Sequence, residues 1–314
     1  MAAPAVLLTP VLGQPERVML QGRVLKEAPG DGSSALTRNV RRLAARNWEG
    51  AKVSVRFQGV TATLTSGHDG GFEVNLLPPE GKAFEPGAFE AEAWVEGATT
   101  SARVEVVPAS TPLLVVSDFD DTVVVTQVTK PTKLVQTALL KDADELEVVP
   151  GMSALYGCLR SGVPSAFALV SGSPVQYLPR VKSFLTRHGF PAGFGVYLRD
   201  LGPGSLSDYK QPIIRRLLTQ FPQPVVLVGD SGEKDPEVYA QIREEFPGRV
   251  KAIYIRDAGR TKDATRFTDM VLFQDARQAA EHAVGLGLAD AACVESTLPK
   301  AAQTPPATAN QTPP

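Results

Sequence analysis

Three aspartates and a threonine directly follow a short apolar run near the middle of the chain. The run is Leu113–Ser117, and Asp118, Asp120, Asp121 and Thr122 come after it. Such a run predicts a buried strand, and ligands of open α/β sheets bind outside the carboxyl ends of the strands. Crowded carboxylates repel one another unless a cation lies among them, and Mg²⁺ binds through one or two carboxylates plus phosphate oxygens. The pattern therefore indicates a metal-assisted phosphoryl site, with an acidic turn as the alternative.

Further polar segments follow in an order that suits the same chemistry. Ser171 and Asp230 directly follow predicted strands, as Asp118 does, and Lys210 precedes a predicted helix. We expect the helix after residue 173 to begin with Pro174, so that its free amides could hold a phosphate. Because these segments all occur in the same chain and in this order, we favour a catalytic site over an acidic turn. The segments are 170–174, 208–210 and 228–236.

The elements that must position these residues alternate between short apolar strands and helices. This alternation predicts an α/β fold with a parallel sheet covered on both faces. Right-handed crossovers then place the carboxyl ends of all the strands on one rim, where the polar segments meet. The expected strands are 113–117, 166–170, 195–198, 225–228, 250–255 and 270–273, and the expected helices are 152–160, 175–188, 212–221, 237–245 and 277–284.

The chain before the apolar run has mostly β character. Alternating apolar residues with turn signals between them predict a small antiparallel β-sandwich. Within it, residues 36–48 have helical spacing and carry Arg38, Arg41, Arg42 and Arg46. A basic amphipathic helix of this kind could lie on an anionic membrane surface, although docking on its own protein is the alternative that we favour. The expected strands are 18–25, 53–57, 72–76, 91–96 and 101–107.

Length and composition indicate a globular protein of more than one domain. The chain has 314 residues, 43% of them hydrophobic and 21% charged, with a net charge of −2, which gives no sign of nucleic-acid binding. We expect an N-terminal extension (1–16), the β-sandwich (17–108), an α/β domain (109–288) and a disordered tail rich in Pro, Ala and Thr (289–314).

Location is predicted from cysteine usage and from the lack of membrane signals. Cys158 and Cys293 have neither the pattern of a disulfide framework nor the spacing of metal ligands, so we expect two reduced thiols. Residues 1–13 lack a positive region and do not resemble a signal peptide, and no apolar run is long enough for a membrane span. We therefore expect a cytoplasmic protein that could bind peripherally at a membrane.

Taken together, the segments at 117–122, 171–174 and 229–239 resemble the haloacid dehalogenase superfamily of aspartyl-phosphate phosphatases. More narrowly, they are similar to the catalytic domain of the actin-patch type of Mg²⁺-dependent phosphatidate phosphatases. The resemblance covers residues 113–255 and extends to the segment 22–25. It implies a doubly wound phosphatase domain, a Mg²⁺ cofactor and a phosphomonoester substrate, with phosphatidate converted to diacylglycerol as the first expectation.

The resemblance also implies roles for individual residues. Asp118 would be the nucleophile and Asp120 the general acid and base. Asp118, Asp230 and the main-chain carbonyl of Asp120 would hold the metal. Ser171, with Gly172, would bind a phosphate oxygen, and Lys210 would neutralise the charge near the nucleophile.

Two of the acids, and the substrate itself, have alternative interpretations. Asp235 could support the metal or Lys210, or it could merely cap its helix, and we expect Asp121 to be structural or an outer support. The substrate could also be a soluble or protein phosphomonoester, and a non-catalytic membrane or scaffold protein could retain the same fold. About thirty residues separate the first motif from the next core helix, which leaves room for only a small cap over the site.

Overall fold

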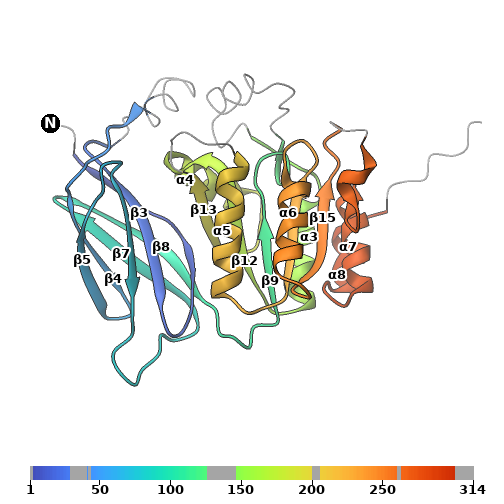
Figure 1. Ribbon diagram of the computed structural model, residues 1–314, viewed down its shortest axis with the longest axis horizontal. Helices are drawn as coiled ribbons and strands as arrows, with labels where there is room; N and C mark the ends of the chain where they lie inside the picture. Colours follow the sequence, from blue (N-terminus) through green and yellow to red (C-terminus); the bar gives the residue numbers. More distant parts are fainter. Residues whose placement is uncertain are drawn as a thin grey trace, which may run out of the picture.

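The structure, a computed structural model, describes residues 3–28, 41, 44–125, 146–199, 206–259 and 263–300 (Figure 1). A mixed α/β part lies beside a part built from β-sheets, in agreement with the expected α/β class. Between them, Val196 N donates to Pro10 O at 2.8 Å, and the Tyr197 hydroxyl accepts from Leu12 N at 3.2 Å. The β part therefore contacts an edge strand of the sheet in the α/β part, and this strand is two positions away from the strand that precedes Asp118.

A six-stranded parallel sheet forms the centre of the α/β part. Each strand is a short run of mostly buried residues, as expected for a sheet covered on both faces. Because all the pairings are parallel, the carboxyl ends of the strands meet at one edge. In spatial order the strands are β13 (Phe194–Arg199), β12 (Ser165–Pro174), β9 (Leu113–Ser117), β14 (Val225–Asp230), β15 (Val250–Arg256) and β16 (Val271–Phe273).

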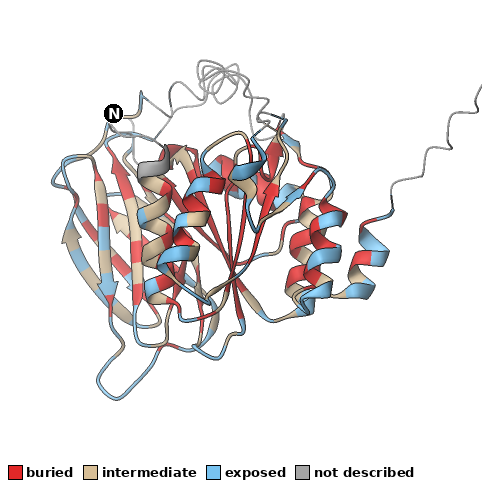
Figure 2. Cartoon of the chain, turned by 45° about the vertical axis from the view of Figure 1, so that its right-hand side comes forward, coloured by how far each residue is buried: buried red, intermediate tan, exposed pale blue. Residues whose placement is uncertain are grey.

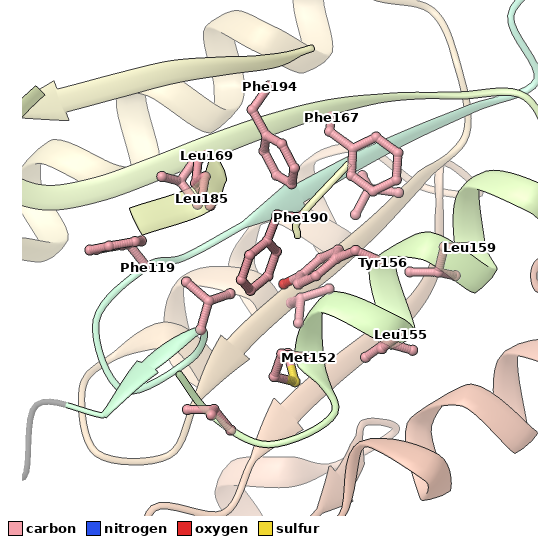
Figure 3. Packing of buried hydrophobic residues seen from close by; sticks show 14 of the residues in the cluster. Phe119, Met152, Leu155, Tyr156, Leu159, Phe167, Leu169, Leu185, Phe190 and Phe194 are labelled. Carbon is pink, nitrogen blue, oxygen red and sulfur yellow. The ribbon is translucent and has the colours of Figure 1, made fainter. Parts of the chain in front are cut away.

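Helices cover both faces of this sheet, and alternate residues of β9 show how. Leu113 and Val115 pack in one hydrophobic cluster with the helices α3 (Met152–Gly162), α4 (Leu178–Arg187) and α7 (Ala276–Gly285) (Figure 3). Leu114 and Val116 pack on the other face with α5 (Leu206–Gln220) and α6 (Asp235–Glu245). In Figure 2, the strands of this sheet are mostly buried, and the helices beside it carry buried residues along part of their length. A short pair of strands, β10 (Val124–Val125) with β11 (Glu147–Val148), and two 3₁₀ turns, Val175–Tyr177 and Ala264–Phe267, complete this part.

The β part contains two sheets that share one hydrophobic core. The expected strands are all present, and the structure adds three more: β1, β2 and β5. Two of these lie in residues 1–16, where we expected only an extension. One sheet holds β1 (Ala5–Leu8), β3 (Val18–Leu25) and β6 (Gly71–Leu76), and the other holds β2 (Val11–Gly13), β8 (Ala98–Val106), β7 (Gly87–Val95), β4 (Lys52–Phe57) and β5 (Val60–Thr65).

The expected basic helix at 36–48 lies largely outside the described residues, and so do Arg38 and Arg42. Arg41 is helical and exposed. The expected helix end is wrong, because residues 45–48 are not helical. Arg46 O accepts from Lys26 N, and residue 48 donates its amide to residue 24, so this stretch hydrogen-bonds to the end of β3.

The C-terminal region corrects two expectations. Residues 291–297 form the helix α8 (Ala291–Thr297), where we expected a disordered tail from 289 onward, whereas residues 301–314 lie outside the described residues. Cys158 of α3 and Cys293 of α8 form a disulfide bond with an S–S distance of 1.99 Å, so the expectation of two reduced thiols is wrong. The cysteines are 135 positions apart, and only the contact of α8 with α3 shows that they are neighbours.

Among the described residues, the helices are all too short or too polar to cross a membrane.

Candidate active site

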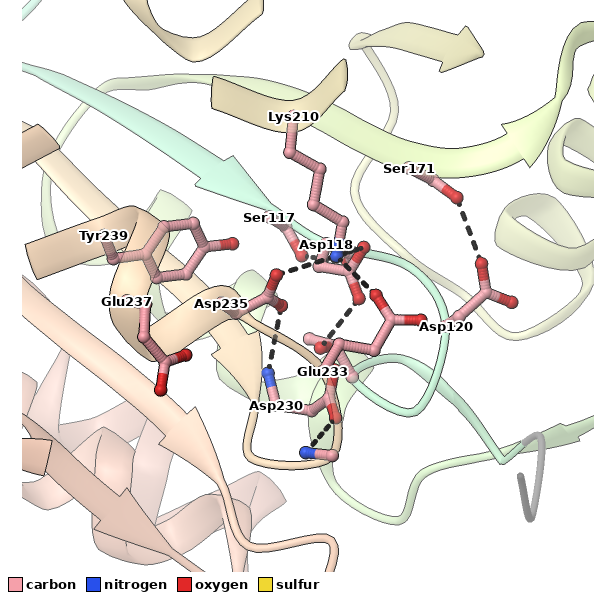
Figure 4. A network of polar contacts seen from close by, with 12 residues as sticks. Ser117, Asp118, Asp120, Ser171, Lys210, Asp230, Glu233, Asp235, Glu237 and Tyr239 are labelled. Carbon is pink, nitrogen blue, oxygen red and sulfur yellow. Dashed lines mark hydrogen bonds and ion pairs between the residues drawn. The ribbon is translucent and has the colours of Figure 1, made fainter. Parts of the chain in front are cut away.

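Asp118 lies at the carboxyl end of β9, at the centre of the sheet edge. Its main-chain N donates to Val228 O at 2.9 Å, which ties it to the neighbouring strand β14. Its side chain is buried, with Oδ1 2.9 Å from Lys210 Nζ and Oδ2 accepting from the Thr122 hydroxyl at 3.3 Å. Both carboxylate oxygens are therefore oriented by polar neighbours (Figure 4).

Asp120 is turned toward a different strand by the residue between the two acids. Phe119 inserts its ring into the hydrophobic cluster of Figure 3, where it packs edge-on against a phenylalanine of α4. Asp120 Oδ2 accepts hydrogen bonds from the hydroxyls of Ser171 at 3.1 Å and Ser173 at 2.9 Å. Burial raises the pKa of Asp120, and the two serine hydrogen bonds oppose this shift. This carboxyl group is therefore suited to carry a proton.

Asp230 and Asp235 occupy the end of β14 and the first turn of α6. Asp230 N donates to Asp235 Oδ2 at 3.2 Å, and Asp230 Oδ1 accepts from Gly232 N at 2.6 Å. The other oxygen of Asp230, Oδ2, is buried and has no hydrogen-bond partner among the described residues. Gly229 permits this packing, because a Cβ there would lie 2.5 Å from Asp235 Oδ2. The absence of a side chain at Gly229 thus lets the buried carboxylates of Asp230 and Asp235 lie close together.

Lys210 extends from α5 into the middle of these acids. Its ammonium lies 2.9 Å from Asp118 Oδ1, 2.7 Å from Asp235 Oδ1 and 3.0 Å from Glu233 Oε2. The N-cap residue of α6 is Lys234, and no side chain caps this helix end. Of the two alternatives for Asp235, support of the site therefore fits the geometry, and helix capping does not.

The site carries more negative than positive charge. Burial raises the pKa of Asp118 well above its usual value, an effect that Lys210 opposes and that the carboxylates of Asp235, Glu233 and Asp230 strengthen. Burial also raises the pKa of Asp230, with Asp235 adding to the shift. One lysine cannot balance four carboxylates in such an environment. A bound cation would restore the balance.

The carboxylates that could hold such a cation are Asp118, Asp230 and Asp235, each of which offers an oxygen within 4.8 Å of the others. Asp230 belongs to this group and has one oxygen, Oδ2, without a hydrogen-bond partner among the described residues, and oxygen donors are the ligands that Mg²⁺ prefers. The side chain of Asp120 is not a member of the group, and its carboxyl bonds to the serines instead. The donor set therefore fits a hard divalent cation.

Gly172 and Asp121, which the sequence analysis also singled out, lie at the periphery of these contacts. Gly172 belongs to the end of β12, which runs to Pro174. The helix that we expected to begin at Pro174 begins at residue 178, after the 3₁₀ turn, so Pro174 does not open it. Lys210 lies inside α5 and not before it, since this helix already includes residue 206. Asp121 is buried and has a φ of +52°, and its main-chain carbonyl accepts a hydrogen bond from Arg256.

The prediction assigned no role to several residues that contact the site. Thr122, Ser173 and Glu233 all lie inside the recognised segments, so their place in the motifs was the available signal. Tyr156 and Arg256 lie outside the segments. The Tyr156 hydroxyl lies 2.6 Å from the hydroxyl of the serine that precedes Asp118, and no sequence pattern marks this contact.

Comparison with known proteins confirms the resemblance for the middle of the chain. Residues 113–257 match the family model described as phosphatidate phosphatase APP1, catalytic domain. Phosphatidate phosphatase APP1 of Saccharomyces cerevisiae is 32% identical over 150 residues, which are 45% of this chain and 25% of that protein. An uncharacterized protein of Schizosaccharomyces pombe is 33% identical over 152 residues, 46% of this chain and 25% of that protein.

The chain thus spans about a quarter of the length of these curated relatives. The matched segment contains Asp118, Asp120, Ser171, Lys210 and Asp230, so every polar segment singled out in the sequence lies within it. A solved structure of the Pnkp1/Rnl/Hen1 complex is similar at 16% identity with a TM-score of 0.33, over 52% of this chain and 46% of that chain, and this weak likeness adds nothing to the assignment.

Proposed function

We propose, from the match of residues 113–257 to the family model of the APP1 catalytic domain, that this chain is a Mg²⁺-dependent phosphatase that converts phosphatidate to diacylglycerol. One observation supports this most directly. The carboxylates of Asp118, Asp230 and Asp235 converge within 4.8 Å of one another at the carboxyl edge of the sheet, with Lys210 bonded to two of them. We assign this part of the chain to the haloacid dehalogenase-like fold.

In the first chemical step, a carboxylate oxygen of Asp118 attacks the phosphorus atom of the monoester. The bond from phosphorus to the ester oxygen breaks, an aspartyl-phosphate forms, and Asp120 transfers its proton to the departing alkoxide. The raised pKa of the buried Asp120 carboxyl suits a group that must hold this proton beforehand. Lys210 stabilises the negative charge that develops on the phosphoryl oxygens.

In the second step, a water oxygen attacks the same phosphorus atom while Asp120, now ionised, accepts a proton from that water. The bond from phosphorus to Asp118 breaks, which releases inorganic phosphate and regenerates the carboxylate. The hydroxyl of Ser171 donates to Asp120 in the structure, and we propose that it donates to a phosphoryl oxygen instead when substrate is bound. One acidic residue thus serves both steps with opposite proton transfers.

Mg²⁺ would be held by Asp118, Asp230 and the main-chain carbonyl of Asp120, with Asp235 supporting Lys210 and the main chain of Asp230. When bound, the ion lowers the repulsion between the attacking carboxylate and the phosphate. The unpartnered Asp230 Oδ2 and the excess of negative charge support this assignment.

Phosphatidate as substrate is supported by the similarity to the S. cerevisiae relative, which is named phosphatidate phosphatase APP1. Acting on this substrate would bring the protein to a membrane surface. Only about thirty residues lie between the first motif and α3, so any cap that they form over the site is small. A small cap would leave the site accessible to a lipid headgroup.

A substrate panel tests the proposal. Phosphatidate in mixed micelles, lysophosphatidate, a sugar phosphate and a phosphopeptide would each be assayed with Mg²⁺ and with a chelator, beside Asp118→Asn as the inactive control. We expect phosphatidate to give the highest kcat/KM and the chelator to abolish turnover. Robust hydrolysis of the sugar phosphate with none of phosphatidate would refute the lipid assignment.

The same panel decides between the alternatives. Preference for the phosphopeptide or the sugar phosphate would indicate a protein or soluble phosphomonoester as substrate. No hydrolysis of any member would favour a non-catalytic membrane or scaffold protein that retains the fold. The buried cluster of Lys210 with the carboxylates of Asp118, Asp230, Glu233 and Asp235 favours catalysis over this last alternative.

A further inference from the structure

Arg256 connects two loops that carry the acids of the site. It is the last residue of β15, which is separated from β9 by β14 in the sheet. Its guanidinium nonetheless reaches the loop after β9, where Nη1 donates to Asp121 O at 2.6 Å. Arg256 lies beyond the polar segments singled out in the sequence, and none of the chemical steps above uses it.

The loop that it reaches has an unusual backbone conformation. Asp121 has a φ of +52°, a left-handed value that residues other than glycine adopt rarely and that persists only where the surroundings enforce it. On one side of this residue stands Asp120, and on the other Thr122 donates to Asp118 Oδ2. The Asp121 carbonyl is thus the point at which a single hydrogen bond can fix the path of the chain between both acids.

The main chain of Arg256 holds the second loop. Its carbonyl accepts from Ser231 N at 2.9 Å, directly after Asp230, with which Arg256 is paired in the sheet register. The same loop is held further along by the Ser231 hydroxyl, which accepts from Ala258 N at 2.9 Å. Arg256 therefore contacts the loop of Asp118 and Asp120 through its side chain and the loop of Asp230 through its backbone.

We propose that Arg256 is a positioning residue, which sets Asp120 and its main chain against Asp118 and Asp230 by holding the Asp121 carbonyl. The inference rests on the proposed phosphatase function and adds a residue to it. Arginine suits this role because its long, planar, always charged fork can span the distance from β15. A misplaced general acid lowers kcat most for substrates whose leaving group must be protonated. Substitution of Arg256 should therefore change kcat in the same direction as substitution of Asp120, but by less.

The kinetic test compares Arg256→Met and Arg256→Lys on an alkyl phosphomonoester and on p-nitrophenyl phosphate. We expect Arg256→Met to lower kcat on the alkyl ester about tenfold and on the activated aryl ester about twofold, with little change in KM. Arg256→Lys should recover part of the alkyl activity. Equal losses on the two esters in both variants, or no loss in either, would overturn the inference.

Arg243 provides the matched control. It also donates from its guanidinium to main-chain carbonyls, those of Asp269 and Thr268 at 3.0 and 3.3 Å, but it lies on the exposed side of α6. Arg243→Met and Arg243→Lys should leave both esters unaffected. Circular dichroism of every variant separates misfolding from misplacement, and if Arg256→Met does not fold, Arg256→Lys decides.

A Mg²⁺ titration by calorimetry gives a readout that does not need turnover. Arg256→Lys keeps the positive charge, so weaker Mg²⁺ binding by this variant reports lost positioning and not altered electrostatics. We expect its Kd to rise severalfold, with Arg243→Lys unchanged. If the unsubstituted protein hydrolyses neither these esters nor phosphatidate, the proposed function fails. The titration alone then decides on Arg256, and unchanged Mg²⁺ affinity would overturn its role.

Discussion

Lys210 and Asp118 form a buried ion pair, with Nζ 2.9 Å from Oδ1 and side-chain exposures of only 3% and 1%. The lysine comes from α5 and the aspartate from the end of β9, so the pair joins a covering helix to the central strand. The same ammonium bonds Asp235 and Glu233. Lys210 thus opposes the rise in the pKa of Asp118 that burial and the neighbouring carboxylates cause.

Asp118→Asn should abolish phosphatase activity and leave the fold intact. The substitution removes the nucleophilic oxygen but keeps the size of the side chain at a strand end, so core packing is unchanged. Removing one of several crowded acids should shift the melting temperature by only a few degrees. Circular dichroism with a phosphatase assay measures both effects. Residual turnover near the unsubstituted level would exclude Asp118 as the nucleophile.

Asp120→Asn should reduce activity in a way that depends on the leaving group. Asparagine cannot supply a proton, so alkyl phosphates should lose on the order of a hundredfold or more in kcat, and p-nitrophenyl phosphate far less. Parallel kcat measurements on the two substrates check this. A deficit of the same size on both would contradict the role of Asp120 as general acid.

Glu233→Gln should change substrate binding through Lys210. Glu233 is the most exposed of the three carboxylates that contact this lysine, with 15% side-chain exposure, and its charge opposes an incoming phosphate. Neutralising it should lower KM on the order of threefold and also lower kcat, because Lys210 loses one of the partners that orient it. Glu245→Gln is the control, since Glu245 bonds Arg215 on the surface of the protein. Identical KM values in all three proteins would refute the prediction.

The metal-free protein should become less stable as the pH rises from about 4 to neutrality. The folded-state pKa values of Asp118 and Asp230 are raised, chiefly by burial, so folding binds protons that the unfolded chain releases. The stability that these groups contribute is complete below their unfolded pKa and is lost as the pH passes their folded pKa. Urea unfolding in chelator at a series of pH values measures this.

Mg²⁺ should reverse that loss at neutral pH, by about 2.7 kcal/mol when its concentration is a hundred times Kd. Asp230→Asn should show a shallower pH dependence in chelator and a smaller response to Mg²⁺, because it removes one of the raised carboxyls and a metal ligand. Stability that increases with pH in chelator, or a full Mg²⁺ response in Asp230→Asn, would contradict the assigned cation site.

Reduction of the disulfide between Cys158 and Cys293 should lower thermal stability. The bond closes a long loop, with 135 positions between the cysteines, and the chain-entropy relation gives about 5 kcal/mol as the upper value for such a loop. Differential scanning calorimetry with and without a reductant measures the effect. Cys293→Ser should melt at the lower temperature and no longer respond to the reductant. A reductant effect that persists in this variant would have another origin.

The sequence alone was enough to predict which polar segments meet at the carboxyl edge of the sheet. The apolar runs before Asp118, Ser171 and Asp230 predicted parallel strands, and parallel strands end at one edge of a sheet whatever their spatial order. Residues at those ends must therefore come close together. Local patterns also identified most helices and strands, because burial periodicity is a property of short segments.

Only the tertiary structure decided which side chains meet across the site. Asp235 bonds Lys210 instead of capping α6, Arg256 reaches past β14 to Asp121, and Cys158 pairs with Cys293. Each of these contacts joins segments that are distant in the sequence, and depends on how helices pack on the sheet and which strands are neighbours. No pattern within a single segment contains that information, because it arises when the elements pack together.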